Sequence, residues 1–178
     1  MFFTGCHRQP AVSQAESETR SESVLQASAP ESDRKKVVLY SYQGLAPSPT
    51  DHKLTRQAPQ DAREIQETVT IPSDGATPDG IMKLYTEKYL SEPVANGSMV
   101  FSYAGAVMDK NGVVTVDFTK AGARYLSYGS MLEMNSLYGI AKTMLMNVEG
   151  STAVCYGIDG GDYSTESFLD RDTPYLTR

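Results

Sequence analysis

The chain has 178 residues and a formal net charge of −6 at pH 7. An acidic chain argues against nucleic-acid binding, which needs a basic surface opposite the phosphates. The chain also has no apolar run of about eighteen residues, so the sequence predicts no membrane-spanning helix.

The first ten residues resemble the start of a bacterial lipoprotein. In Phe3-Thr4-Gly5-Cys6 a small residue precedes a cysteine, and such a cysteine is lipidated after removal of the signal peptide before it. The apolar stretch Met1-Phe2-Phe3 is shorter than that of a full signal peptide. We expect Cys6 to carry a lipid that anchors the protein to the extracytoplasmic side of the cell membrane. The alternative is an ordinary N-terminal segment with an incidental cysteine.

Residues 1–36 are expected to form a disordered tether. Residues 9–36 are rich in Ser, Glu, Ala and Gln and contain almost no large apolar side chains. Such a segment buries too little apolar surface to offset the entropy lost on ordering. Residues 37–178 are then expected to form a single folded domain.

Two strands are predicted at the start of this domain. Val37–Tyr40 is a short continuous apolar run, which is typical of a buried strand. In residues 64–71, apolar residues alternate with polar ones, the pattern of a half-buried strand. The proline-containing segment between them, residues 43–60, is expected to be irregular.

A short helix follows the second strand. Thr77-Pro78 predicts its start, because a Thr side chain caps the first turn and Pro is tolerated at the first helical position. Apolar residues at helical spacing carry it to about residue 91.

A β-hairpin is predicted over residues 98–118. Asn111-Gly112 lies between two apolar runs and favours a two-residue loop, since both residues tolerate positive φ. With that loop, Val116 lies opposite Val107, and both side chains face the core.

The longest helix is predicted at residues 130–147. Ser130 and Glu133 have the spacing of a capping box, in which each side chain bonds the backbone amide of the other. One face of this helix is apolar and should pack on the hairpin. Its members are Met134, Leu137, Ala141, Met144, Leu145 and Val148.

A last strand is predicted at residues 152–158, followed by a glycine-rich turn. The acidic residues beyond it do not have the spacing of an EF-hand calcium loop, so we expect a solvated tail instead. These residues are Asp159, Asp162, Glu166, Asp170 and Asp172. The predicted order of strands and helices indicates an α+β fold, a mostly antiparallel sheet packed by two helices.

Several segments resemble the GerM domain family. They are Val38-Leu39-Tyr40, Val116-Asp117-Phe118-Thr119, Ile140-Ala141-Lys142-Thr143-Met144 and Ile158-Asp159-Gly160. The resemblance covers residues 37–162. The chain departs from the family pattern at residues 61–79 and at Leu90-Ser91-Glu92-Pro93.

The resemblance implies a fold like the ring-building motif, a βαββα unit through which related proteins assemble into rings. It also implies an envelope lipoprotein of a Gram-positive bacterium, of the kind found in sporulation and germination. Such a protein would be a non-catalytic, membrane-tethered scaffold without a cofactor. Its partners would be further copies of itself or other envelope proteins.

The residues themselves also argue against catalysis. His7 lies in the tail and His52 in the irregular segment, and no Cys or His spacing fits a metal site. Cys155 is expected to be a small buried residue, the alternative being a disulfide with Cys6. We therefore expect no enzyme, and no catalytic, cofactor-binding or metal-binding residues.

A second stripe on the long helix is a candidate interaction face. Leu132, Gly139 and Met146 recur every seven residues, and Gly139 would let another backbone approach closely. An exposed apolar strip there would mark a contact with a second copy or a partner. Alternatively, residues 119–129, a loop or short helix, fold back and cover it.

Three classes of function follow from these observations. An envelope scaffold is favoured. A monomeric module that binds cell-wall glycan or peptide would need a cleft lined by Tyr103, Tyr125, Tyr128 or Tyr156. A hydrolase would need a nucleophile and a base that the sequence does not indicate.

Overall fold

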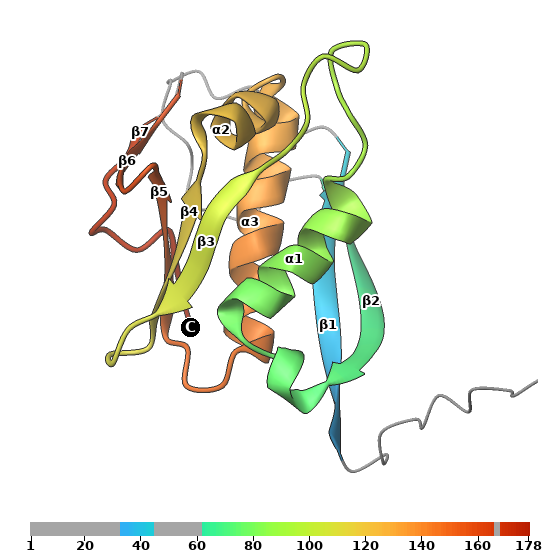
Figure 1. Cartoon of the computed structure of the whole chain (residues 1–178), viewed down its shortest axis with the longest axis vertical. Coiled ribbons are helices and arrows are strands. Elements are labelled where there is room, and N and C mark those ends of the chain that lie inside the picture. Colours follow the sequence, from blue (N-terminus) through green and yellow to red (C-terminus); the bar gives the residue numbers. More distant parts are fainter. Residues whose placement is uncertain (1–32, 45–61, 166–167) are drawn as a thin grey trace, which may run out of the picture.

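The computed structural model describes residues 33–44, 62–165 and 168–178 (Figure 1). Residues 1–32 of the predicted tether and most of the irregular segment lie outside these residues, whereas residues 34–36, expected to belong to the tether, form the start of the first strand. In chain order the elements are β1 (Arg34–Gln43), β2 (Arg63–Pro72), a 3₁₀ turn (Ser73–Gly75), α1 (Pro78–Tyr89), β3 (Tyr103–Met108), β4 (Val113–Phe118), α2 (Lys120–Leu126), α3 (Ser130–Asn147), β5 (Ala153–Ile158), β6 (Gly161–Ser164), β7 (Phe168–Leu169) and β8 (Leu176–Thr177). The expected α+β class is confirmed.

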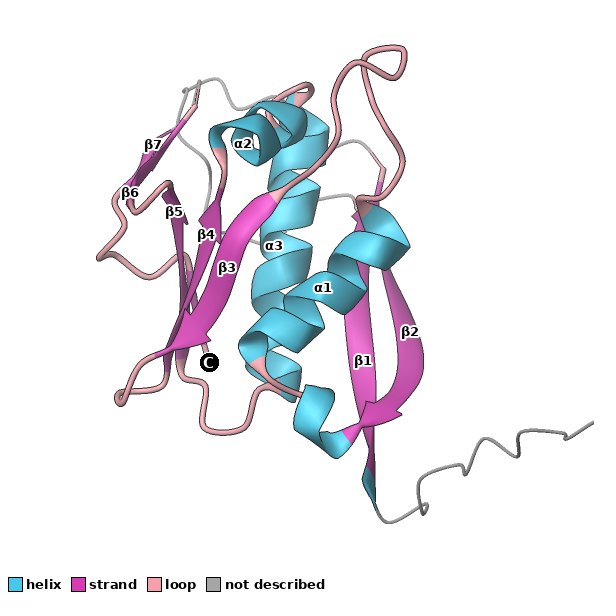
Figure 2. Cartoon of the chain, viewed as in Figure 1, coloured by secondary structure: helices cyan, strands magenta, loops and turns pink. Residues whose placement is uncertain are grey.

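The helices lie between two sheets (Figure 2). Within the described residues, one sheet has six strands in the order β3-β4-β5-β6-β7, with β8 paired to β5, and the other is the pair β1–β2. The long helix α3 runs between them and contacts both β1 and β5. β4 and β5 are parallel, as expected for strands joined by a helical crossover. The other strand pairs are antiparallel.

The two shorter helices begin at threonine caps. Thr77 Oγ1 accepts a hydrogen bond from the Gly80 amide at 3.1 Å, which confirms the predicted start of α1. Thr119 Oγ1 accepts one from the Gly122 amide at 3.0 Å. Residues 119–129, for which the sequence predicts a loop or a short helix, therefore contain the helix α2.

The helix α3 has the predicted bounds, but its N-terminal cap differs. Its N-cap is Gly129 rather than Ser130. Glu133 is buried, and its Oε1 accepts hydrogen bonds from the hydroxyls of Tyr163 at 2.6 Å and Thr165 at 2.8 Å. The predicted capping box is wrong because hydroxyl donors from the C-terminal segment bind this carboxylate.

The predicted apolar face of α3 is confirmed. All six of its residues are buried, none more than 5% exposed. Tyr156 of β5 donates a hydrogen bond from its hydroxyl to the Leu137 carbonyl, which ties this strand to the same face. Tyr163 and Tyr175, from beyond β5, are also buried and lie against Tyr156.

The register of the β3–β4 hairpin differs by one residue from the prediction. Val116 pairs with Ala106 and not with Val107. Because successive side chains in a strand point to opposite faces, the shift turns Ala106 inward and leaves Val107 67% exposed.

The cause of this shift is a longer turn. The Asp109 amide donates to the Val113 carbonyl at 3.0 Å, so three residues form the loop instead of two. Gly112, at the end of the loop, has a φ of 80°, the conformation that closes such a loop. Asp109 Oδ1 also accepts from the amides of Asn111 and Val113, both at 2.9 Å.

At Gly139, both β1 and α1 approach α3 closely. A Cβ atom at this position would overlap the Tyr85 hydroxyl and lie 2.6 Å from the Tyr40 carbonyl oxygen. Gly139→Ala should therefore lower the free energy of unfolding by about 1–3 kcal/mol. Gly105→Ala is the control, since nothing lies within 4 Å of a Cβ there. Urea denaturation of both variants checks this, and equal stabilities would contradict it.

Candidate functional site

The three residues of the predicted interaction face do not form an exposed strip. Met146 is 56% exposed, whereas Leu132 is half-buried and Gly139 is buried. The side chain of Tyr85 in α1 and the backbone of Tyr40 in β1 cover Gly139. Gly139 does allow another backbone segment to approach closely, but this segment is Tyr40 of the same chain. A role for Met146 in association stays a prediction.

Several residues singled out in the sequence lie outside the described residues: Cys6, His7, His52 and Glu166. Cys155 is buried in β5, as expected. In the described part of the chain, no three His, Cys, Asp or Glu side chains are placed to hold a metal ion. None of the helices described is long and apolar enough to cross a bilayer.

The described acidic residues after β5 are exposed, as expected, but they do not belong to an irregular tail. Asp162 Oδ1 accepts a hydrogen bond from the Arg171 amide at 3.0 Å, and Asp170 Oδ1 accepts one from the Asp172 amide at 2.8 Å. The segment forms β6, β7 and β8 instead. It is held on the sheet by three buried side chains, Tyr163, Leu169 and Tyr175.

Polar side chains of α3 bind the backbone of β1 at its free edge. Asn147 Oδ1 accepts from the Val38 amide at 2.8 Å, and Asn147 Nδ2 donates to the Val38 carbonyl at 2.7 Å. One turn earlier, Thr143 Oγ1 accepts from the Tyr40 amide at 2.9 Å. These are bonds that a neighbouring strand would otherwise make, so the helix takes the place of a strand.

Sequence reasoning missed this role of Thr143 and Asn147. The two residues are four positions apart and therefore lie on one side of the helix. Their side chains are only 1% and 7% exposed. Two polar residues at helical spacing within an apolar helix could have indicated this role, because buried polar groups need hydrogen-bond partners.

The contact of Asn147 should be essential for stability. Asn147→Ala leaves the Val38 amide and carbonyl without partners and should lower the free energy of unfolding by about 2–4 kcal/mol. Asn147→Asp keeps the acceptor but loses the donor, and should be destabilising as well. Urea denaturation measures both, with exposed Met146→Ala as the control. Wild-type stability in Asn147→Ala would show that β1 does not depend on this side chain.

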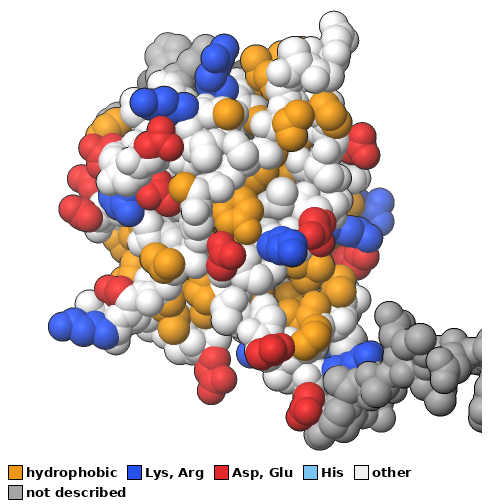
Figure 3. Space-filling model, viewed as in Figure 1, with side chains coloured by type: hydrophobic (Ala, Val, Ile, Leu, Met, Phe, Trp, Pro, Cys, Tyr) orange, Lys and Arg blue, Asp and Glu red, His pale blue; other side chains and the backbone are white. Residues whose placement is uncertain are grey.

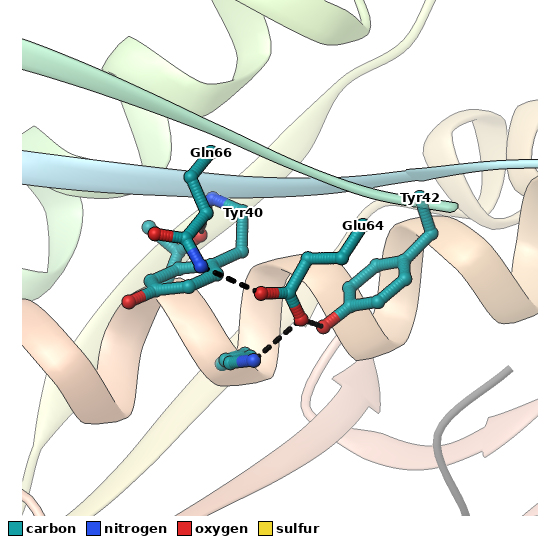
Figure 4. Close-up of polar contacts among 6 residues, drawn as sticks. Tyr40, Tyr42, Glu64 and Gln66 are labelled. Carbon is teal, nitrogen blue, oxygen red and sulfur yellow. Dashed lines mark hydrogen bonds and ion pairs between the residues drawn. The ribbon is translucent and has the colours of Figure 1, made fainter. Parts of the chain in front are cut away.

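A polar cluster joins β1, β2 and α3 further along the same contact (Figure 4). Glu64 Oε2 lies 2.5 Å from Lys142 Nζ and 2.5 Å from the Tyr42 hydroxyl. Glu64 Oε1 accepts from Gln66 Nε2 at 2.8 Å. Lys142 Nζ also lies 4.6 Å from the centre of the Tyr40 ring, within the range of a cation–π interaction.

These contacts keep Glu64 ionised. The hydrogen bond from Lys142, followed by that from Tyr42, lowers the pKa of the Glu64 carboxyl to about 2. Burial, and then the hydrogen bond to Glu64, raise the pKa of the Tyr42 hydroxyl. Three donors therefore hold this carboxylate in place as a hydrogen-bond acceptor.

The Glu64 cluster should make stability depend on pH. The carboxyl pKa is about 2 in the folded protein and 4.5 in its ordinary state, so the stabilisation is present above pH 4.5 and is lost as pH falls toward 2. At pH 7, Glu64→Gln should lower the free energy of unfolding by about 1 kcal/mol. The difference from wild type should shrink at pH 3.

Urea denaturation at pH 7 and pH 3 measures this effect, with the exposed Glu149→Gln as the matched control. A difference between wild type and Glu64→Gln that is equal at both pH values would contradict it.

A small hollow of about 180 Å³ lies beside the cluster, between β1, α1 and α3. Tyr42, Tyr85 and Tyr89 line it together with the Asn135 side chain. Asn135 Oδ1 is buried and has no hydrogen-bond partner among the described residues. Because a buried oxygen needs a donor, the hollow suits water or one small polar group.

A larger, open groove of about 540 Å³ lies between α2 and β6. Lys120 and Arg124 line one side, and Asp162 lies across from them. Lys120 is also 3.8 Å from the Asp159 carboxylate. Charges of both signs indicate no single class of ligand for this groove.

The tyrosines considered for a glycan-binding cleft do not share one. Tyr125 and Tyr156 are buried in the core. Tyr103 is half-buried, whereas Tyr128 is 58% exposed. The cleft that this function would need is therefore not formed by these four residues.

On the face seen in Figure 3, exposed apolar side chains lie in groups separated by charged and polar side chains. The large exposed hydrophobic residues of the described chain are Val100, Val107, Met108, Tyr128, Met131, Met146 and Phe168.

Solved structures that are similar to this chain include two bacterial proteins. The tandem GerMN domains of the sporulation protein GerM from Bacillus subtilis align with a TM-score of 0.43 and 13% identity, over 86% of this chain and 49% of that chain. This chain therefore spans about half the length of the GerM structure. A candidate lipoprotein from Clostridium perfringens aligns with a TM-score of 0.32 and 14% identity, over 73% of this chain and 78% of that one. No protein-family model and no curated protein matches the sequence.

Proposed function

We propose that this protein is a non-catalytic assembly module of a Gram-positive cell envelope, with a role in sporulation or germination. A lipid on Cys6 tethers it to the outer side of the cell membrane, and the folded domain associates with further copies of itself or with other envelope proteins. The lipobox-like Phe3-Thr4-Gly5-Cys6, the polar residues 9–36 and the resemblance to GerM domains support this proposal.

The observation that supports a non-catalytic role is how the domain uses the carboxylates of Glu64 and Glu133. Glu64 binds Lys142 and Tyr42, joining β2 to α3 and β1. Glu133 of α3 accepts hydrogen bonds from Tyr163 of β6 and from Thr165. Each carboxylate is engaged in holding elements of the fold together. This use supports a structural role for both carboxylates.

Lipidation of Cys6 is the first point to test. The gene is expressed from its own locus in the native host, and the cells are labelled with an alkyne fatty acid. The wild-type protein should carry the label and sediment with membranes, whereas Cys6→Ala should lose the label and leave the membrane fraction. Cys155→Ala is the matched control and should keep both. An unlabelled wild-type protein would refute the tether.

A monomeric module that binds cell-wall glycan or peptide is the second candidate. The hollow lined by Tyr42, Tyr85 and Tyr89 favours it, because Asn135 Oδ1 is buried there without a donor. At about 180 Å³ the hollow would take only one side group of such a ligand, since ligand pockets usually exceed about 300 Å³. Binding of soluble peptidoglycan fragments that is lost in Asn135→Leu would favour this candidate.

A further inference from the structure

The strand edges of this domain are closed to different degrees. The edge of β1 that faces α3 is bonded by Thr143 and Asn147. At the edge of β3, the Asp79 carboxylate of α1 accepts a hydrogen bond from the Ala106 amide at 3.3 Å. The outer edge of β2 has no hydrogen-bond partner among the described residues. Figure 1 shows no helix or strand beyond it.

The pairing of β1 with β2 identifies the backbone groups that are open. Val38 lies opposite Thr68 and Tyr40 opposite Gln66, yet the backbone of Val38 and Tyr40 bonds α3. In an antiparallel pair, two opposite residues either bond each other or both point away. The amide and carbonyl groups of Gln66 and Thr68, and by alternation of Thr70, therefore point outward from β2.

The second half of this edge lacks the features that normally keep strand edges apart. The strand β2 is ten residues long, and its pairing with β1 is unbroken by a bulge. Its second half, Thr68-Val69-Thr70-Ile71, is uncharged, and a proline occurs only at its last position, Pro72. Native edge strands are usually short, bulged, or protected by lysine or proline. An open edge of this length is a template for another strand.

We propose that β2 pairs with β2 of a second copy of this chain. The two strands run antiparallel about a two-fold axis at Thr68 and form a continuous four-stranded sheet with the two β1 strands. This inference rests on the proposed function, for which it names the surface of self-association.

The sequence of β2 is self-complementary in this register. Thr68 lies opposite Thr68 of the other copy, and Ile65 lies opposite Ile71, so Thr–Thr and apolar pairs form across the axis. Glu67 lies opposite Val69, and no like charges meet. An axis at Glu67 would instead place this carboxylate opposite itself, which is unfavourable. Self-complementarity is the condition for a two-fold interface.

The test measures the solution mass of the full chain by light scattering over a concentration series. All variants carry Cys6→Ser, so that no disulfide links two copies. The parent should convert from monomer to dimer with rising concentration. Thr68→Pro removes an amide that points outward from β2, and it leaves the hydrogen bonds between β2 and β1 in place. It should weaken dimerisation at least about tenfold, since both copies lose a hydrogen bond at the axis.

Two further variants separate pairing from folding. Thr68→Ala keeps the amide and should dimerise within about threefold of the parent. Thr68→Lys leaves the backbone intact but places two positive charges opposite each other at the axis, so it should weaken the dimer even if Thr68→Pro fails to fold. Circular dichroism of each variant reports whether the monomer is folded.

Cysteine cross-linking tests the register. Opposite residues in the proposed pair have Cα atoms about 5.5 Å apart, within the reach of a disulfide. Under oxidation Thr68→Cys should therefore form a covalent dimer. Thr70→Cys should not, because it lies opposite Gln66 and is about four residues away from its own copy along the strand.

Several outcomes would overturn the proposal. They are a parent that stays monomeric at its highest soluble concentration, a dimer that survives both Thr68→Pro and Thr68→Lys, and a dimer that dissociates only with Met146→Glu. The last result would place the interface on α3. Labelling of Cys6 does not depend on these results, so failure of the β2 interface is distinguishable from failure of the tether.

Discussion

The contact between α3 and β1 is the constraint on which the arrangement of the domain depends. A two-stranded sheet is marginal by itself in water, and β1 and β2 form such a sheet. Thr143 and Asn147 bond its inner edge to the helix, and Gly139 lets the strand approach closely. The helix α3 thereby packs against both sheets, and each of these contacts buries one of its faces.

This arrangement determines which parts of the surface are free. The inner edge of β1 is occupied by α3, and the Glu64–Lys142 pair binds β2 to the same helix. In the β1–β2 sheet, the outer edge of β2 has backbone groups open for pairing and no partner within the described chain. The polar side chains of α3 therefore hold the helix and the β1–β2 sheet together, and the outer edge of β2 stays exposed.

Much of the fold could be predicted because local signals agreed with the tertiary structure. The Thr77 cap, the extent of α3 to Asn147 and the apolar face of α3 all follow from helix periodicity and capping. The hairpin register could not be predicted in the same way. Asp109 accepts two backbone hydrogen bonds that lengthen the loop, and a one-residue change in a turn reverses every side chain of a strand.

The sequence by itself determined the class of fold, the positions of the main strands and helices, and the apolar face of the long helix. These features depend on residues close together in the chain, and the spacing of the apolar residues indicates which face of a helix or strand is buried. Only the tertiary structure decided that Gly139 is covered, that Glu133 binds Tyr163, and that β2 has an open edge. Each depends on residues distant in sequence, and local spacing contains no information about which distant segment packs against a given face.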